Sequence, residues 1–502
     1  MIVSTVQIKN DFYKFREKDF GEKRVLDKLS PYEKNISQYL EPWLTVSKNH
    51  DDVYPSQGLL LTPFDGLPVS SLQMLPQEKI IETLRMRLFF LELFNHPHRI
   101  EFLKSVTAEK FQPPDKIESE VFDYATKSGL SLSVGDLGAS VTGSAQDRVS
   151  RTERYAQGPF IKLGIQGRNI FVGSSSPDVW NSSQAISTMA ACHSLACIPR
   201  NGVMSLVSRQ ADLARDVFDK LNTLSNLLLV KRPDQKQVLG WWKNNVVGTL
   251  ETNPKTALVR AKALYQAGIR SFRIYSPEPG IDLEKTTKII RSEFGNKVEI
   301  FSGQVVDIDQ AKRVENAGAN CLFVGIGGGG RCVTGVRSGS AIDWPELVWK
   351  LRGEVGIPVI VEGGASDHVA TTLLLGASGI SVSRVVAGGT IESPGGLLYC
   401  SDDSGKLFKP YGGEASARTK FLDGKLLPFT IPSFVEGETT KAELSYIKNV
   451  HPTLTYNLHV LIEDAILAMV FRGAKSISEL QSISPSPLRR LTSSGRFQMN
   501  SH

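Results

Sequence analysis

A cysteine in a glycine-rich stretch is the first candidate for chemistry in this chain. Residues 325–339 read GIGGGGRCVTGVRSG and place Cys332 shortly after the apolar run 322–324. Glycines let a backbone approach a ligand closely, and a cysteine in such a loop can act as a nucleophile. The neighbouring Arg331 carries a positive charge that favours the reactive thiolate. The alternative interpretation is a structural thiol, because most cysteines are inert.

A second glycine-rich region follows shortly after the first. Residues 358–394 read PVIVEGGASDHVATTLLLGASGISVSRVVAGGTIESP, which alternates strand-like and helix-like stretches with glycine turns. The carboxylate of Glu362 can accept hydrogen bonds from hydroxyl groups. Gly363, Gly364 and Gly388 can expose backbone N–H groups, which suit a phosphate. One Gly-Gly pair is weak evidence, but two such loops after a cysteine loop favour an anion site.

The elements that must position these loops form a repeat of short β-rich runs and helical stretches. Eight strands are expected at 169–172, 195–198, 246–250, 271–275, 298–301, 321–324, 358–361 and 379–382. Helices are expected at 254–267, 282–294, 307–317 and 367–375, the first with Asn253 as N-cap and Pro254 at its first position. Eight strand–helix units predict a (β/α)8 barrel, whose chemistry lies in the loops after the strands.

The first third of the chain has a different character. Between 76 and 111 apolar residues recur at three- and four-residue steps, with a break at His96-Pro97, so the pattern predicts helices. A buried helix face is the favoured interpretation of this stripe, and a partner-binding helix is the alternative. We expect a partly helical region of unknown role at 1–126, a linker or mobile connection at 127–157, the barrel domain at 158–490 and a tail at 491–502.

Composition limits the classes of function. The 502 residues are 41% hydrophobic and 22% charged, as in ordinary globular proteins. The net charge of +6 suits small anions, whereas the chain lacks the dense basic runs typical of nucleic-acid binding. Five cysteines without metal-ligand spacing predict free thiols in a reducing compartment and no metal centre. By inspection no apolar run reaches the length needed to span a bilayer, so a cytoplasmic protein without membrane contact is expected.

These motifs resemble those of one known family. The run Cys332-Val333-Thr334 in its glycine loop resembles the catalytic loop of the IMP dehydrogenase and GMP reductase family. Glu362-Gly363-Gly364 is similar to the family's Asp-Gly-Gly, and 386–395 is similar to its second phosphate loop and the run beyond it. Segments 435–437 and 473–480 are similar to the flap end and C-terminal segment of the dehydrogenase branch. The likeness covers roughly 160–500, and the barrel has no gap large enough for the family's cystathionine-synthase-type regulatory domains.

The resemblance implies a mechanism and a set of site residues. Cys332 would add to C2 of a purine nucleoside 5′-monophosphate, and a hydride would move to or from NAD or NADP. Thr334 and Arg418 would assist catalysis. Substrate would be bound by Gly330, Glu362, Gly363, Gly364, Ser383, Arg384, Tyr411, Gly413 and Glu436, and cofactor by Tyr275, Gln304, Gly325 and Gly327. The resemblance also implies a mobile flap at about 412–438, a homotetramer and a potassium ion at the Cys332 loop.

Several positions depart from the family pattern. Tyr275 stands where the family has an Asp and Gln304 where it has an Asn, and both positions help to hold the nicotinamide and the base. Gly330 replaces a phosphate-binding serine, for which Arg384 can compensate, because an arginine binds anions more strongly than a hydroxyl does.

The flap and the overall function leave alternatives open. The segment 412–438 lacks the Arg-Tyr pair of the dehydrogenase flap and offers Arg418 as its basic candidate. Glu414 is the nearest candidate for the reductase's glutamate, although an ungapped match puts Ser416 there. The alternative functions are a nucleotide-binding paralogue that acts as sensor or assembly partner, and a flavin-dependent barrel.

Overall fold

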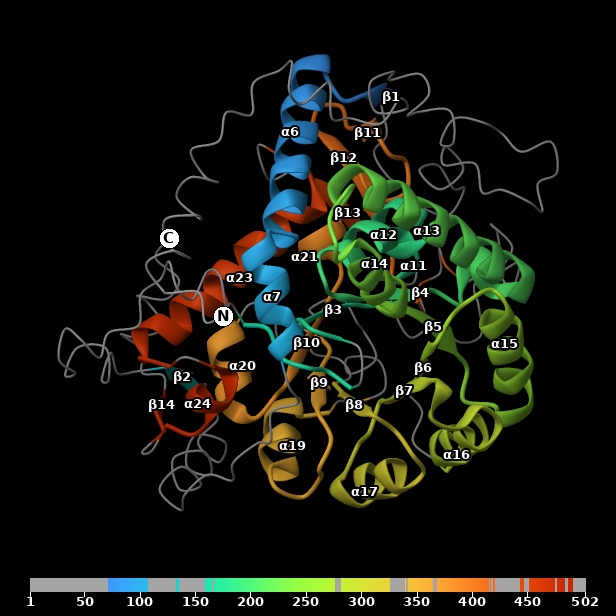
Figure 1. The fold of residues 1–502 in the computed structure, drawn as a ribbon, viewed down its shortest axis with the longest axis vertical. Helices are drawn as coiled ribbons and strands as arrows, with labels where there is room; N and C mark the ends of the chain where they lie inside the picture. Colours follow the sequence, from blue (N-terminus) through green and yellow to red (C-terminus); the bar gives the residue numbers. More distant parts are fainter. Residues whose placement is uncertain are drawn as a thin grey trace.

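A closed barrel of eight parallel strands forms the centre of the molecule (Figure 1). The computed structural model describes residues 71–106, 132–134, 159–164, 167–275, 281–325, 339, 342–363, 368–414, 416, 419, 443–446, 451–474, 476–483 and 486–490. The strands are β3 (Phe171–Gly173), β4 (Leu195–Ile198), β5 (Val246–Leu250), β6 (Ser271–Tyr275), β7 (Glu299–Gly303), β8 (Cys321–Val324), β9 (Val359–Val361) and β10 (Gly379–Val382). Since β10 pairs with β3, the sheet closes, and the predicted (β/α)8 barrel is confirmed.

The strands are short apolar runs because both of their faces are buried. Residues of β3, β4, β5, β7, β8, β9 and β10 are buried throughout, inside against the barrel core and outside against helices. The helices of this outer layer are α12 (Ser183–Ala191), α13 (Val207–Leu228), α14 (Gln235–Asn244), α15 (Pro254–Gln266), α16 (Asp282–Phe294), α17 (Ile308–Asn316), α19 (Trp344–Leu351) and α20 (Val369–Leu375). Short helices α11 (Pro177–Trp180) and α21 (Arg384–Ala387) follow β3 and β10.

Local capping signals start two of these helices as the sequence predicts. The side-chain oxygen of Asn253 accepts hydrogen bonds from the backbone N–H groups of Lys255 and Thr256, at 3.1 and 3.3 Å. Asp307 accepts from the N–H of Gln310 at 2.6 Å. Each cap satisfies donors that the first helical turn leaves without a partner.

Two N-terminal helices pack on the side of the barrel. They are α6 (Gln77–Phe94) and α7 (Pro97–Ser105), and the chain turns between them at His96, as predicted. Helix α6 lies along α23 (Leu454–Phe471), so segments from opposite ends of the chain are neighbours (Figure 1). Leu88 and Leu91 of α6 are buried, which confirms the buried-face interpretation of the apolar stripe.

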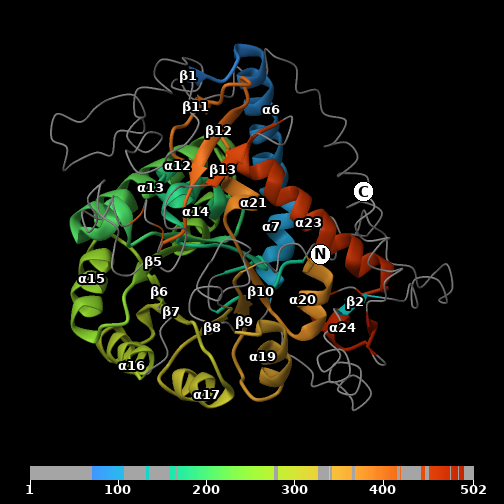
Figure 2. The ribbon, with the colours of Figure 1, turned by 180° about the vertical axis from the view of Figure 1, so that it is seen from behind.

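Two small sheets outside the barrel pair distant parts of the chain with one another (Figure 2). The first has the order β1-β11-β12-β13, from β1 (Ser71–Met74), β11 (Leu398–Ser401), β12 (Leu407–Tyr411) and β13 (Glu443–Tyr446). The second pairs β2 (Leu132–Val134), inside the predicted linker, with β14 (Leu488–Arg490), which follows α24 (Ile477–Gln481). The second sheet therefore pairs a segment that precedes the barrel in the sequence with one that follows it.

Helix α23 corrects one expectation from the sequence. It has 18 residues with a hydropathy of 1.4, so the expectation that no run reaches membrane-spanning length is wrong by length and composition. One face of this helix is buried, with Leu458, Ile462 and Ile466 among its inward residues, and it packs against α6, α20 and α21. A helix inside a protein core and a membrane helix share this composition, because both replace water around apolar side chains.

Candidate active site at the carboxyl ends of the barrel strands

The described residues include about half of the candidate site residues. Those that lie outside them are Cys332, Thr334, Gly327, Gly330, Gly364, Arg418 and Glu436. Those that the structure describes are Tyr275, Gln304, Gly325, Glu362, Gly363, Ser383, Arg384, Tyr411 and Gly413. The barrel strands run in parallel, so the end of β6 and the residues directly after β7, β8, β9 and β10 meet at one rim, which we call the mouth.

A steric constraint explains why Gly325, the first residue of the glycine-rich stretch that contains Cys332, is a glycine. Gly325 has φ +125°, and a Cβ at this position would lie 2.0 Å from the carbonyl oxygen of Glu362. The backbone N–H of Glu362 donates to the carbonyl of Val324 at 2.8 Å. The end of β8 and the residue after β9 are therefore in backbone contact, and only glycine fits between them.

The carboxylate of Glu362 is the centre of the polar contacts at the mouth. Its Oε2 accepts a hydrogen bond from an Arg273 Nη2–H at 2.5 Å and from the Gln304 Nε2–H at 2.7 Å. Its Oε1 accepts from the hydroxyl of Ser381 at 3.2 Å. Glu362 and Gln304, both expected from the sequence to serve the site, are thus in direct contact with each other.

Arg273 is the residue that sequence reasoning missed. It lies in β6 and its side chain is 1% exposed. Its guanidinium carbon lies 4.6 Å from the ring centroid of Tyr275 and 4.3 Å from that of Phe323, and Nη1–H donates to the Ser175 hydroxyl at 3.3 Å. The signal was available, because an arginine amid buried strand residues needs a partner charge.

The electrostatic environment of the mouth favours the charged form of Arg273 beside Glu362. Burial is the largest single influence on Arg273 and opposes its positive charge, but the neighbouring carboxylate of Glu362, together with Glu414 and other acidic groups, offsets it and holds the pKa of Arg273 above its ordinary value. Burial raises the pKa of the Tyr275 phenol, and the carboxylates of Glu414 and Glu362 add to that effect. Tyr275 therefore contributes a neutral ring to the mouth.

Glu414 and the loop after β4 complete the described part of the mouth. The Asn201 Nδ2–H donates to Glu414 Oε1 at 3.3 Å, and an Arg200 Nη2–H donates to the carbonyl oxygen of Tyr275 at 3.1 Å. Burial raises the pKa of Glu414, against the opposing effects of Arg200 and Arg273. A carboxyl group with a raised pKa beside arginines is a candidate for proton transfer.

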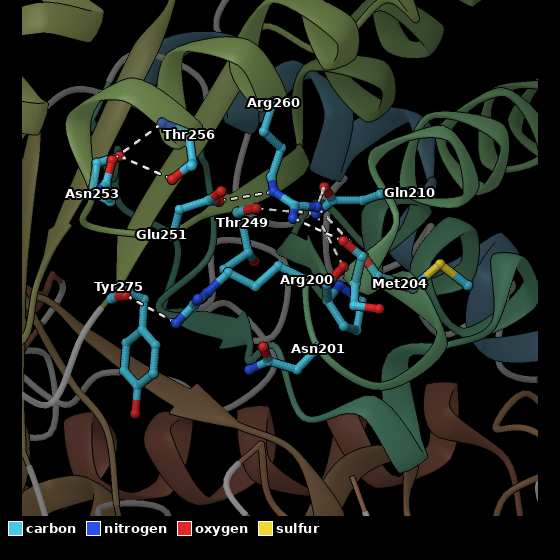
Figure 3. Close-up of polar contacts among 12 residues, drawn as sticks. Arg200, Asn201, Met204, Gln210, Thr249, Glu251, Asn253, Thr256, Arg260 and Tyr275 are labelled. Carbon is cyan, nitrogen blue, oxygen red and sulfur yellow. Dashed lines mark hydrogen bonds and ion pairs between the residues drawn. The ribbon is translucent and has the colours of Figure 1, made fainter. Parts of the chain in front are cut away.

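A separate network of hydrogen bonds around Gln210 and Arg260 stabilises the loop that carries Arg200 and Asn201 (Figure 3). The amide nitrogen of Gln210 donates to the carbonyl oxygens of Pro199 and Thr249, both at 3.0 Å, and so ties α13 to the ends of β4 and β5. Arg260 donates to Glu251 at 2.8 Å and to the side-chain oxygen of Gln210 at 2.9 Å. The loops after β4 and β5 are therefore fixed by buried hydrogen bonds.

The second glycine-rich region ends at the same rim. Ser383 follows β10, and its hydroxyl oxygen is buried without a hydrogen-bond partner in the part of the chain that the structure describes. Arg384 is the next residue and is half-buried. Tyr411 ends β12, and the carbonyl of Gly412 beyond it accepts from the Ser176 hydroxyl, after β3, at 3.2 Å. Gly413 follows directly, so the start of the expected flap segment reaches the mouth.

The four described cysteines are buried thiols. Burial raises the pKa of Cys197 to about 12 and raises the pKa values of Cys192 and Cys321. Cys400 is also buried. Thiols of this kind are protonated and shielded at neutral pH, so none of these four suits nucleophilic chemistry.

Comparison with known proteins identifies the family. A model of the IMP dehydrogenase / GMP reductase domain matches residues 169–502, which is well over half of the chain. The chain belongs to this family. Inosine-5′-monophosphate dehydrogenase from Mycobacterium leprae is 26% identical over 261 residues, 49% of this chain and 47% of that protein. Inosine-5′-monophosphate dehydrogenase 1 from Arabidopsis thaliana is 30% identical over 195 residues, 37% of each chain. The enzyme from Helicobacter pylori is 28% identical over 284 residues, 53% of this chain and 55% of that protein.

These matches have limits that bear on function. The matched segment spans about half or less of the curated relatives. The family match begins at Asn169, close to β3, and thus includes every strand of the barrel. The N-terminal helices α6 and α7 lie before the matched region.

Proposed function

We propose that this member of the family is an oxidoreductase acting on a purine nucleoside 5′-monophosphate, with Cys332 as the nucleophile that adds to C2 of the base. The observation that supports this most is the junction of β8 with the mouth. The strand ends at Val324, Gly325 packs on the backbone of Glu362, and the chain then continues into the loop that contains Cys332. A nucleophile in that loop lies at the end of a barrel strand, where the chemistry of such barrels takes place.

The phosphate of the ligand is assigned to the loop after β10. Arg384 is half-buried at this position, and an arginine can bind a phosphate through two parallel hydrogen bonds. The Ser383 hydroxyl beside it is buried and has no partner among the described residues, so it is available for the same group. Gly363, Gly364 and Gly388 supply the glycine backbone around this loop.

A nicotinamide cofactor fits the described residues in one respect. The Gln304 Nε2–H is bound by Glu362, so its Oε1 is fixed as an acceptor, and this buried atom has no hydrogen-bond partner in the described part of the chain. We assign Gln304 and the ring of Tyr275 to the carboxamide-bearing ring of NAD or NADP, which supplies hydride transfer when bound. The homotetramer and the potassium site at the Cys332 loop stay predictions.

The decisive experiment for this function is a direct assay. Purified protein is incubated with IMP and NAD, and separately with GMP and NADPH, while the absorbance of the reduced cofactor is followed. Turnover in either mixture supports the proposal and identifies the direction. Absence of turnover in both contradicts it.

The nucleophile can be tested independently of turnover. Cys332 should react with iodoacetamide faster than the four buried cysteines, because a thiolate reacts and a shielded thiol does not. Saturating IMP or XMP should protect it, and Cys332→Ala should abolish turnover while affinity for the monophosphate stays within about tenfold. An active alanine variant, or an alkylation rate that nucleotide leaves unchanged, would exclude the covalent mechanism.

One observation favours a second candidate, a nucleotide-binding protein without redox activity. Tyr275 and Gln304 differ from the family pattern at positions that help to hold the nicotinamide and the base, and the structure adds Arg273, which already occupies Glu362. Calorimetric binding of IMP, XMP or GMP without turnover would support a sensor or assembly role.

A further inference from the structure

The inference concerns the sugar subsite, by which we mean Glu362 with Arg273, Gln304 and Ser381. It rests on the proposed binding of a nucleoside monophosphate. A carboxylate that holds a vicinal diol gives one oxygen to each hydroxyl, so both of its oxygens need a free lone pair. In the resembled family an aspartate at this position accepts both ribose hydroxyls.

The lone pairs of Glu362 are largely used by the protein itself. Oε2 accepts from Arg273 and from Gln304, which uses both of its lone pairs. Among the residues that the structure describes, Oε1 accepts only from the Ser381 hydroxyl, at 3.2 Å, which leaves one lone pair. The Glu362 side chain is 21% exposed, so that remaining lone pair can be reached from the mouth.

The contact of Arg273 with Glu362 resists displacement by a ligand. The Arg273 side chain is 1% exposed and lies between the rings of Tyr275 and Phe323. A hydroxyl that displaced the guanidinium from Oε2 would leave a buried positive charge without its counter-charge, and a neutral group cannot compensate for that. Gln304 is similarly restrained, because its side chain is 1% exposed.

We propose that Arg273 is a specificity-determining residue that converts the sugar subsite from a receptor for a vicinal diol into a receptor for a single hydroxyl. The protein then binds nucleoside 5′-monophosphates that carry either the 2′- or the 3′-hydroxyl, and 2′-deoxyribonucleotides belong to its ligand class. Removal of both hydroxyls weakens binding, since the last lone pair on Oε1 then lacks a donor.

Wild-type protein provides the first test, by calorimetric titration with IMP, 2′-deoxy-IMP, 3′-deoxy-IMP and 2′,3′-dideoxy-IMP. We expect the first three to bind with dissociation constants within about threefold of one another and the dideoxy form to bind about tenfold more weakly, a difference of roughly 1.4 kcal/mol. A tenfold loss on removal of either single hydroxyl overturns the inference. Failure of all four to bind overturns the proposed function as well.

A variant provides the second test. Arg273→Met removes the guanidinium and frees a lone pair on Oε2, so loss of either hydroxyl should then weaken binding by about tenfold. The matched control is Arg232→Met, which breaks another arginine–carboxylate pair, with Asp234, and touches the backbone of Asn95 instead of the mouth. In the control, the ratios of the dissociation constants for IMP and its deoxy analogues should stay those of the wild-type protein.

The fold of each variant is checked by circular dichroism and thermal melting. A folded Arg273→Met variant with wild-type ratios overturns the assignment to Arg273. If that variant does not fold, the wild-type titrations decide, because they require no substitution.

Discussion

The seam and the mouth of this molecule each bury an arginine against a glutamate, and they differ in what else the carboxylate contacts. At the seam, where α6 and α7 meet the barrel and α23, Arg87 Nε lies 3.4 Å from Glu392 Oε1, with side chains 3% and 0% exposed. Glu392 also accepts from the Thr453 hydroxyl at 2.5 Å and the Leu454 N–H at 3.0 Å. Both of its oxygens bind the start of α23, so this pair joins segments of the chain.

The pair at the mouth has the same chemistry in a different setting. Arg273 is as deeply buried as Arg87, but Glu362 is 21% exposed and keeps a lone pair on Oε1. Two buried polar atoms that have no hydrogen-bond partner among the described residues, Gln304 Oε1 and Ser383 Oγ, lie after β7 and β10 at the same rim. The difference teaches that a buried arginine–glutamate pair can serve a ligand only where its carboxylate is partly exposed, as that of Glu362 is and that of Glu392 is not.

The largest expected effect is on the stability of the seam. Arg87→Met should lower the free energy of unfolding by about 3–5 kcal/mol, because it leaves the charge of Glu392 buried without its partner. Denaturant unfolding measures this, with Lys312→Met in an exposed pair as the control that should leave the transition midpoint unchanged. Affinity for IMP should be that of wild type. A small loss of stability would show that the seam pair is not structural.

The next largest effect is on ligand binding at the mouth, and it should leave the stability of the protein unchanged. Arg384→Ala should weaken binding of IMP by about 1.5–3 kcal/mol, the range for a charge-assisted hydrogen bond, and should leave binding of inosine unchanged. Calorimetry with both ligands measures the difference, and denaturant unfolding should detect little change. Equal losses for nucleotide and nucleoside would assign Arg384 to support of the loop alone.

The smallest expected effect is a pH dependence of the free energy of unfolding, caused by His193 at the seam. Burial, with nearby arginines, lowers the pKa of His193 to about 3, and its Nε2 lies 3.0 Å from Asn95 Oδ1. Folded His193 stays neutral where an unfolded histidine binds a proton below pH 6.5, so stability falls as pH falls from 6.5 towards 3. The full slope is about 1.4 kcal/mol per pH unit.

His193→Asn tests that slope and keeps the backbone conformation. His193 has φ +64°, which asparagine tolerates better than other non-glycine residues. Denaturant unfolding of both proteins between pH 5 and 7 should give a flatter pH dependence in the variant. Parallel curves would mean that His193 does not titrate as its burial implies.

The barrel could be predicted closely from the sequence, and the site only in part. Strands such as Cys321–Val324 and helices such as Asp282–Phe294 match the expected bounds, because apolar periodicity and caps are local signals. The membrane-length helix α23 was missed, since polar residues such as Asn457 and Asp464 interrupt its apolar sequence. Cys332 and Arg418 lie outside the described residues, so their roles stay predictions.

The sequence by itself determined the barrel repeat, the glycine loops and the family motifs, since each depends on residues that are near one another in the chain. Only the tertiary structure decided that Arg273 of β6 and Gln304 after β7 both bind Glu362 after β9. These contacts span 89 and 58 residues, and they form because closure of the barrel brings the strand ends to one rim. The number of lone pairs left on Glu362 depends on these contacts at the rim, and no sequence motif around Glu362 predicts it.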